Sequence, residues 1–385
     1  MATNSSAELA SNLGPNTNQV SASVRPRRKV WPRLLAAILC FAALEGAIFH
    51  TGLYSSIIEP NSTTGEMELW LRNEIRRPKI NRNQVLAVGH SRMALLPRVV
   101  NPYPPGSDYT FATIGLGGTT PRIWYYGLRA VDPTAHAYAA IVIPSDDYNE
   151  PDTYDNHAER EADLHYVLAR LQLRDLLEFP WTYRNHKLQW ITFRGILLKG
   201  FVYKRDFMEF IDHPLARIPK ARYYQADSAG WYYGYGGVDT SLAGLRIDWQ
   251  HGTMQFPDRV PENERKRIQG LLFPPLPPNQ GVETAYLRYW YGKIIEYYRG
   301  SGTKLIFLRV PRAPTSPPDP APKLNSAVRQ IASQPNVIVL DEHLFDQLEH
   351  PDLFWDAWHL NRQGMEAFSH ILANEVRRVL GPPKS

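Results

Sequence analysis

Five short apolar segments constrain the fold of this chain more than any other feature of its sequence. Each is rich in aliphatic residues, and each is separated from the next by a stretch long enough for at least one helix. Strands buried on both faces of a parallel sheet have this pattern. The right-handed connection between parallel strands then favours a doubly wound arrangement. We therefore predict a flavodoxin-like three-layer α/β/α fold with a mainly parallel five-stranded sheet, with strands at residues 84–88, 109–112, 139–144, 304–310 and 336–340.

The stretch between the third and fourth segments is too long for a single crossover. We interpret it as a large insertion, at about residues 155–300, which caps the functional site or binds a partner. It contains predicted helical pieces at 157–177 and an aromatic run at 231–237. The composition, 43% hydrophobic and 21% charged, is that of a folded globular chain.

An apolar run at residues 34–53 predicts a membrane anchor, because about 20 such residues can cross a bilayer as a helix. Arg25, Arg27, Arg28 and Lys29 precede the run, and basic flanks mark the cytoplasmic side. We predict a disordered cytoplasmic tail at 1–30, a transmembrane anchor at 31–54 and an extracytoplasmic domain at 55–385. The protein is then single-pass, with its domain in the periplasm or at the cell surface.

Two polar residues within the run leave alternatives open. Glu45 and His50 interrupt it, and a carboxylate in a bilayer is costly unless it is protonated or paired with another helix. A cleaved signal peptide and a buried helix of a soluble protein are the competing interpretations. The lone cysteine, Cys40, can form no intrachain disulfide, and Leu39 before it argues against a lipoprotein signal.

A serine follows the first predicted strand, in the sequence Gly89-His90-Ser91-Arg92. We predict a helix at 92–100, so that Ser91 would lie at a strand-to-helix turn. A serine placed there is a suitable nucleophile, because the helix amino terminus favours developing negative charge. The alternative is a helix-capping serine without chemistry.

Near the carboxyl end, Asp356 lies three residues before His359, and a predicted helix follows at 364–379. This spacing allows one loop to supply both partners of a nucleophilic serine. The imidazole takes the serine proton, and the carboxylate orients the ring. Taken alone, the pair is equally compatible with a cap or a surface contact.

In this order, the two motifs resemble those of the SGNH (GDSL-like) hydrolase superfamily. Ser91 matches the serine of its first block, and Asp356 and His359 match its last block. Gly115 resembles the second-block glycine, which implies that its N–H joins the oxyanion hole. The resemblance covers roughly residues 82–150 and 302–380.

The sequence departs from this family in two places. His90 stands where the first block has an aspartate. The third block normally supplies an oxyanion-hole asparagine, but this chain has Asp146 and Asp147, and an ionised carboxylate cannot donate a hydrogen bond. Asn149 is the nearest candidate for that donor.

An anchor with an altered third block is similar to the membrane-anchored branch that includes alginate O-acetylation and DltD-like proteins. The resemblance implies a serine esterase or O-acyltransferase that acts on an acylated polysaccharide or other envelope polymer. It also implies a membrane-bound O-acyltransferase as a partner. Arg92 would help to hold an anionic substrate, or would pair with a carboxylate in a structural role.

The sequence leaves hydrolysis and transfer open, since both use one acyl-enzyme. A catalytically inactive scaffold that binds polysaccharide or docks a synthase is the second hypothesis. We find no phosphate-binding loop, no dinucleotide fingerprint and no zinc spacing, and we expect no cofactor and no metal. The net charge is +5, but basic residues are not interleaved with aromatic ones along one element, so we expect no nucleic-acid partner.

Overall fold

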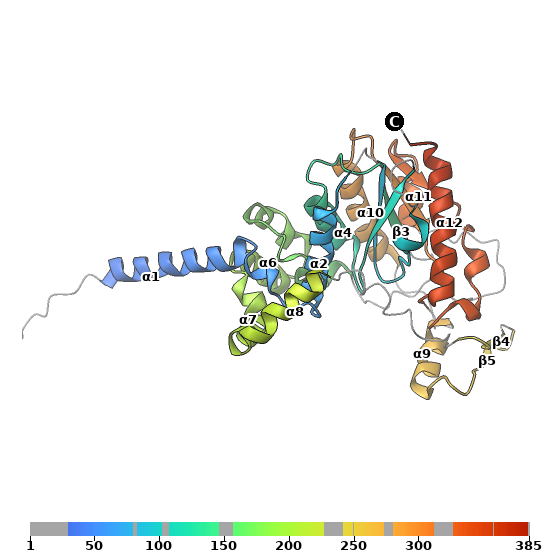
Figure 1. The fold of residues 1–385 in the computed structure, drawn as a ribbon, viewed down its shortest axis with the longest axis horizontal. Coiled ribbons are helices and arrows are strands. Elements are labelled where there is room, and N and C mark those ends of the chain that lie inside the picture. Colours follow the sequence, from blue (N-terminus) through green and yellow to red (C-terminus); the bar gives the residue numbers. More distant parts are fainter. Residues whose placement is uncertain are drawn as a thin grey trace, which may run out of the picture. The chain divides into compact units, whose positions relative to one another are not determined.

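The computed structural model describes residues 30–79, 83–101, 108–145, 157–226, 242–248, 250–272, 280–311, 326–356 and 358–383. The chain divides into two units, Met1–Leu44 and Glu45–Ser385 (Figure 1). The predicted aromatic run at 231–237 lies outside the described residues. The second unit carries the sheet and both predicted motifs.

One helix, α1 (Val30–Glu45), carries most of the apolar run, and it continues through a π-helical turn, η1 (Gly46–His50). Residues Trp31–Ser56 are long and apolar enough to cross a membrane, which supports the prediction of an anchor. The side chains up to Leu44 are exposed, whereas Glu45 is buried and belongs to the second unit. The folded body therefore begins within the run that we predicted as the anchor.

A five-stranded sheet forms the centre of the second unit, as predicted. The strand order is β2-β1-β3-β6-β7, and every neighbouring pair is parallel. All five strands overlap the predicted segments. They are β1 (Gln84–Gly89), β2 (Thr110–Gly115), β3 (Ala140–Ser145), β6 (Lys304–Arg309) and β7 (Val337–Val339).

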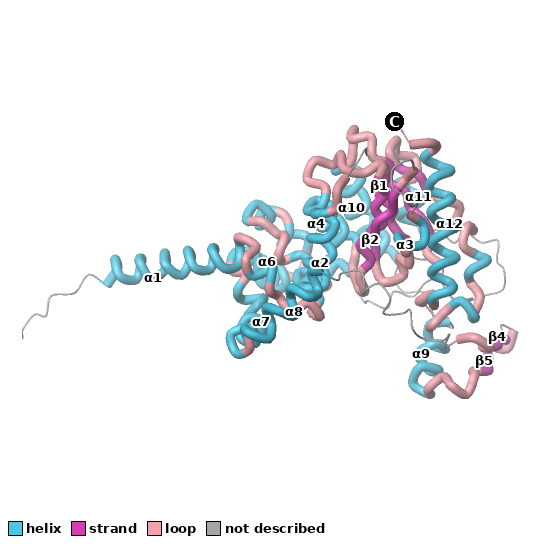
Figure 2. Tube along the Cα trace, in the orientation of Figure 1, coloured by secondary structure: helices cyan, strands magenta, loops and turns pink. Residues whose placement is uncertain are grey.

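Each face of the sheet packs into its own hydrophobic core, because side chains alternate along a strand. Leu86 and Val88 belong to one core, which includes residues of α2 (Thr63–Arg76), α4 (Pro121–Val131) and α10 (Gln280–Tyr297). Val85 and Ala87 belong to the other core, to which α12 (Arg362–Leu380) contributes Phe368, Leu372 and Val376. Figure 2 shows the magenta strands among these helices. Because both faces of the sheet are buried, the sequences of its strands are almost continuously apolar.

Most described residues between β3 and β6 are helical. Three helices, α6 (His186–Leu197), α7 (Gly200–Asp212) and α8 (Pro214–Ala226), follow one another and contact in sequence order. The helical pieces predicted at 157–177 are short. The other elements of this stretch are η3 (His157–Glu159), α5 (Ala162–Val167), η4 (Leu173–Leu177), η5 (Phe179–Thr182), the hairpin β4 (Arg246–Asp248) and β5 (Thr253–Gln255), and α9 (Glu262–Leu272).

One predicted helix is wrong. Residues 92–100 contain only a four-residue helix, α3 (Pro97–Val100). Leu96 is extended, because the residue before a proline is disfavoured in helical conformation, and the helix begins at Pro97. By contrast, the helix predicted at 364–379 is confirmed as α12.

The remaining short elements are η2 (Tyr54–Ser56), α11 (Ser326–Ile331), η7 (Asp346–Leu348) and η8 (Pro351–Leu353).

Candidate active site

Ser91 lies in a tight turn just beyond the carboxyl end of β1. The N–H of Met93 donates to the carbonyl of His90 at 3.0 Å, which closes the turn around Ser91. Gly89 leads into this turn because no side chain fits there: a Cβ would lie 2.6 Å from Pro144. Ser91 is thus positioned by a turn and close packing, and not by a helix amino terminus as we expected.

The loop that carries Asp356 and His359 is held at both ends. Phe354 and Leu360 form an antiparallel bridge, and the N–H of Trp355 donates to the carbonyl of His359 at 2.8 Å. Asn361 then caps α12 by accepting from Gly364 N–H. The imidazole therefore projects from a short, fastened loop at the start of α12.

Ser91, His359 and Asp356 form one hydrogen-bonded chain. Ser91 Oγ lies 2.8 Å from His359 Nε2, and His359 Nδ1 lies 2.9 Å from Asp356 Oδ2. The side chains of His359 and Asp356 are 14% and 13% exposed, so the chain is shielded yet reachable. Ser91 comes from one predicted motif and Asp356 and His359 from the other, and the structure brings them into hydrogen-bonding contact.

The carboxyl group of Asp356 is strongly acidic. Burial alone would raise its pKa, but the His359 ring and the backbone N–H groups of Trp358 and His359 outweigh it, and the pKa falls to about 2. An ionised carboxylate only accepts hydrogen bonds, so the facing Nδ1 of His359 must carry a proton. In the neutral ring, Nε2 then accepts from the Ser91 hydroxyl.

A second pair shows that the Asp–His spacing is not sufficient by itself. Asp248 also lies three residues before a histidine, and His251 Nδ1 lies 2.8 Å from Asp248 Oδ2. Both side chains are more than half exposed on the β4–β5 hairpin, at 51% and 67%. Among the residues that the structure describes, no serine contacts the His251 ring. The contact with Ser91 therefore distinguishes His359 from His251.

Helix α12 is tied directly to the serine turn. The hydroxyl of Ser369 accepts from Leu96 N–H at 2.8 Å and donates to the carbonyl of Met365 at 2.7 Å. Ser369 is fully buried. A single side chain therefore connects the segment after Ser91 to the helix that follows His359.

The loop after β2 brings a glycine beside the serine, but it is not the glycine that we predicted. A Cβ on Gly117 would lie 4.0 Å from Ser91 Cβ, whereas one on Gly115 would meet the carbonyl oxygen of Met93 at 3.1 Å. Leu116 N–H donates to Gly89 in the neighbouring strand. Since donors alternate along a strand, Gly115 N–H points away from β1. The geometry favours Gly117, whose signal in the sequence is only its place in the Gly117-Gly118 pair.

Neither Ser91 N–H nor Gly117 N–H has an acceptor within the described part of the chain. The Gly117 loop is fixed from several sides. Tyr166 donates to the Gly117 carbonyl at 2.6 Å, and Thr119 Oγ1 donates to the Gly89 carbonyl at 2.9 Å. The backbone that carries Gly117 is therefore held in place beside Ser91.

The base of this loop rests on a buried ion pair. Arg122 and Asp163 are both fully buried, with a closest N–O separation of 3.3 Å, and Thr120 donates to Asp163 at 3.0 Å. The guanidinium also lies 4.1 Å from the ring centre of Tyr183. The segment after β3 therefore supports the loop that faces Ser91.

Two other predicted site residues differ in outcome. Arg92 is 8% exposed, and its guanidinium donates to the carbonyl of Pro311 at 3.2 Å, which favours the structural alternative. Its role in substrate binding stays a prediction. Asn149 lies outside the described residues, as do Asp146 and Asp147. Among the residues that the structure describes, no cluster of three metal-ligating side chains occurs.

The fold and these side chains define an α/β protein with a parallel five-stranded sheet and a serine–histidine–aspartate constellation beyond the end of β1. The chain matches no protein-family model and no curated protein. The side chains of the site are therefore the basis for a functional proposal.

Proposed function

We propose that this protein is a membrane-anchored serine esterase or O-acyltransferase that works through an acyl-enzyme on Ser91. The hydrogen-bonded chain Ser91–His359–Asp356 carries this proposal. The contact between Ser91 and His359 joins positions 268 residues apart. A surface cap or a local Asp–His pair would not require it.

The reaction would proceed in two steps. Ser91 Oγ attacks the acyl carbonyl while His359 Nε2 takes the hydroxyl proton, and the bond between the acyl carbon and the leaving oxygen breaks as His359 returns the proton to that oxygen. Water or a polymer hydroxyl then attacks the acyl carbon while His359 takes its proton, and the bond from that carbon to Ser91 Oγ breaks as His359 returns the proton to the serine. Asp356 remains ionised and stabilises the imidazolium.

The amides of Ser91 and Gly117 would stabilise the oxyanion of the tetrahedral intermediate. Two observations support this role. Gly117 lies close to Ser91, and among the described residues neither N–H group has an acceptor. One oxyanion donor contributes roughly 10²–10³ in rate. Asn149 is the candidate for a third donor.

The proposed substrate class rests on the resemblance to the SGNH superfamily. Numbered by their order in the chain, the five core strands have the spatial order 2-1-3-4-5, which flavodoxin-like folds also have, and this supports that layering. In the membrane-anchored branch, such domains act on acylated envelope polymers beside a membrane-bound O-acyltransferase. We propose the same setting here, with the amino terminus in the cytoplasm, the domain outside it, and residues 155–300 as an insertion.

The test is a pre-steady-state reaction of the full-length protein with p-nitrophenyl acetate, with intact-mass detection of the acetyl adduct. We expect a burst and an adduct that are lost in Ser91→Ala and in His359→Ala. His251→Ala is the matched control, because it removes a histidine from an Asp–His pair of equal spacing. It should react like the unmodified protein.

A folded protein that forms no adduct would count against the enzyme. Full polymer acylation in cells that carry only the Ser91→Ala variant would instead favour the inactive scaffold. Adding a polysaccharide acceptor to the acetylated enzyme separates the two remaining activities, because transfer moves the acetyl group to the polymer and hydrolysis releases acetate.

A further inference from the structure

The exposed part of the apolar helix is too short to cross a bilayer by itself. Residues Trp31–Leu44 are exposed, and fourteen helical residues extend about 21 Å, against a hydrocarbon core of about 30 Å. About six more residues are needed, and Glu45–His50 are the next six in the chain. These six belong to the folded body. A span of sufficient length therefore brings the part of the body that holds them to the bilayer surface.

Helix α7 holds these residues. The ring of Phe49 stacks on Tyr203, with 5.9 Å between ring centres, and lies edge-on to Phe207 at 5.3 Å. The N–H of Gly200 donates to Glu45 at 3.0 Å, and His50 Nε2 lies 3.1 Å from the same carboxylate. The carboxylate that interrupts the apolar run is thus paired at the amino end of α7.

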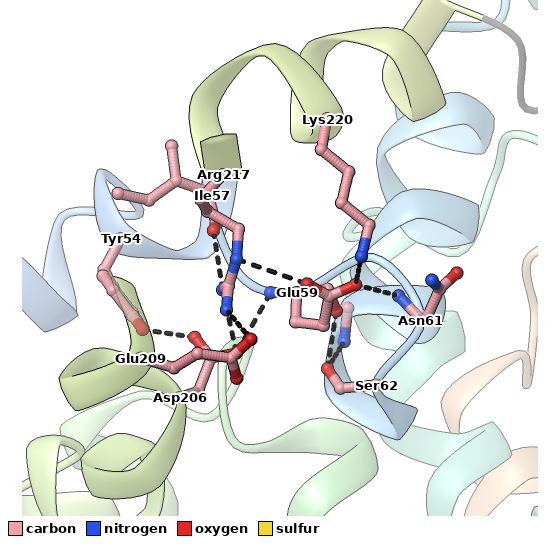
Figure 3. A network of polar contacts seen from close by, with 10 residues as sticks. Tyr54, Ile57, Glu59, Asn61, Ser62, Asp206, Glu209, Arg217 and Lys220 are labelled. Carbon is pink, nitrogen blue, oxygen red and sulfur yellow. Dashed lines mark hydrogen bonds and ion pairs between the residues drawn. The ribbon is translucent and has the colours of Figure 1, made fainter. Parts of the chain in front are cut away.

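A polar network fastens α7 and α8 to the residues that follow the apolar helix (Figure 3). Arg217 of α8 is 4% exposed and lies 3.0 Å from Asp206 of α7 and 3.3 Å from Glu59. Tyr54 donates to the same Asp206, and Lys220 of α8 pairs with Glu59. The two helices are therefore bonded to residues 54–59, which follow the apolar helix in the chain.

The opposite face of α7, which we name the outer face, exposes apolar and basic side chains. Phe201, Met208 and Ile211 are each about half exposed, and they lie on one side of the helix because they are separated by about two turns and one turn. Lys204 and Arg205 lie between them on the same side and are exposed. Such a stripe is typical of a helix at a membrane interface.

The neighbouring helices α6 and α8 also expose large apolar side chains. Trp190 of α6 is 61% exposed and Leu215 of α8 is 87% exposed. Residues 186–226 contain eight Lys and Arg and three Asp and Glu, a net charge of +5. Two of the eight basic residues, Lys199 and Arg217, are buried, whereas Lys187, Arg194, Lys204, Arg205 and Arg222 are exposed. Basic charge beside exposed aromatic and aliphatic groups suits anionic lipid headgroups.

We infer that α6–α8 form a second membrane-contact surface, with the outer face of α7 in the headgroup region of a bilayer that contains anionic lipid. The inference rests on the proposed anchor, because the span delivers α7 to that depth. The surface fixes the orientation of the domain on the membrane, so the distance of Ser91 from the bilayer becomes constant.

The test places nitroxide labels on the full-length protein in nanodiscs and measures their collisions with oxygen and with a water-soluble nickel chelate. Met208→Cys and Leu215→Cys, each with Cys40→Ser, report on the surface. Arg378→Cys is the control, because Arg378 is 70% exposed on α12. Cys40 itself, labelled in the unmodified protein, reports on the anchor. Near-UV circular dichroism checks that each variant is folded.

We expect oxygen to dominate at Met208 and Leu215, and nickel to dominate at Arg378. Replacing part of the phosphatidylcholine with phosphatidylglycerol should increase the oxygen preference at Met208. The double variant Lys204→Gln/Arg205→Gln should remove that response.

Labels at Met208 and Leu215 that behave like Arg378, while Cys40 lies in the bilayer, would overturn the inference and leave the anchor intact. An aqueous Cys40 would overturn the anchor and, with it, the inference. A label at Met208 that is shielded from both reagents would indicate a protein on this face, and would also contradict a lipid contact.

Discussion

Asp356 determines which ring nitrogen of neutral His359 carries the proton. Because the pKa of Asp356 is about 2, its carboxylate stays ionised across the working range of most proteins and holds the proton on Nδ1. The nitrogen that faces Ser91 is then the acceptor. The Asp248–His251 pair has a similar local geometry. It differs from the Asp356–His359 pair because Ser91, which comes from a distant part of the chain, contacts His359.

Gly117 gives a first prediction at this scale. Gly117→Ala would place a methyl group 4.0 Å from Ser91 Cβ, which is an ordinary contact that the fold can accept. We expect the unfolding free energy to change by less than about 0.5 kcal/mol. The preference for acetyl over butyryl p-nitrophenyl esters should increase by about tenfold or more, since the methyl group occupies acyl space. An unchanged preference would remove Gly117 from the site.

Lys199 gives a second prediction. Burial, offset in part by Glu68 and Glu45, lowers the pKa of Lys199 from 10.5 to about 8. The unfolded chain therefore keeps its proton to higher pH than the folded protein, and folding stability increases from about pH 8 to about pH 10.5. Over this pH range the unfolding free energy should increase by on the order of 3 kcal/mol.

The measurement compares urea unfolding of the unmodified protein and Lys199→Met between pH 7 and pH 10. The difference in unfolding free energy should favour the variant at pH 7 and shrink as the pH increases. A difference that does not depend on pH would show that Lys199 titrates normally.

Single residues also mark the limits of the sequence prediction. Ser91, Asp356 and His359 could be found because residue type, spacing and order carry the signal. The proximity of Gly117 rather than Gly115 could not be found, since it depends on the direction of backbone N–H groups at the end of β2. The packing of Arg92 against Pro311 likewise depends on a contact across 219 residues.

At the scale of elements, the strands were predictable because a parallel sheet buried on both faces requires uninterrupted apolar segments. Helix α12 was predictable from its position after the Asp–His loop. The helix at 92–100 was overpredicted because Pro97 forces Leu96 into an extended conformation. The β4–β5 hairpin was missed, since its three-residue strands are too short to show a pattern.

Ser369 provides the prediction at this scale. Ser369→Ala leaves the buried N–H of Leu96 without its acceptor, which costs about 1–3 kcal/mol of stability. The reaction of Ser91 should also slow, because α12 and the serine turn lose their direct link. Thr192→Ala is the control, as it removes an equally buried hydroxyl from α6 that bonds only within its own helix. It should leave the Ser91 rate unchanged, and equal rates in both variants would show that Ser369 only stabilises the fold.

For the whole molecule, the boundary between span and body is the feature that the sequence obscured. The apolar run contains both an exposed helix and residues that pack in the domain, and Ile48 and Phe49 of the run pack against a hydrophobic core. Just after the run, Tyr54 and Ile58 are 2% and 4% exposed and belong to the same hydrophobic core. Hydropathy does not distinguish lipid contact from core contact, so this division required the fold.

This boundary predicts how the protein tolerates truncation. A chain that starts at Glu45 retains Phe49, Tyr54 and Ile58, whereas one that starts at Asn61 loses all three. Loss of one buried aromatic side chain costs about 3–5 kcal/mol. We expect the shorter chain to unfold at lower urea concentration, or to aggregate, when the two are compared by circular dichroism. Equal midpoints would mean that residues 45–60 add no stability to the body.

The activation of Ser91 by His359 can be measured by the reaction of the full-length protein with a fluorophosphonate, followed by peptide mapping. We expect one adduct, on Ser91, formed about 10²–10⁴-fold more slowly in His359→Ala and at an unchanged rate in His251→Ala. A folded protein that carries no adduct on Ser91, or one that reacts equally fast without His359, would contradict it.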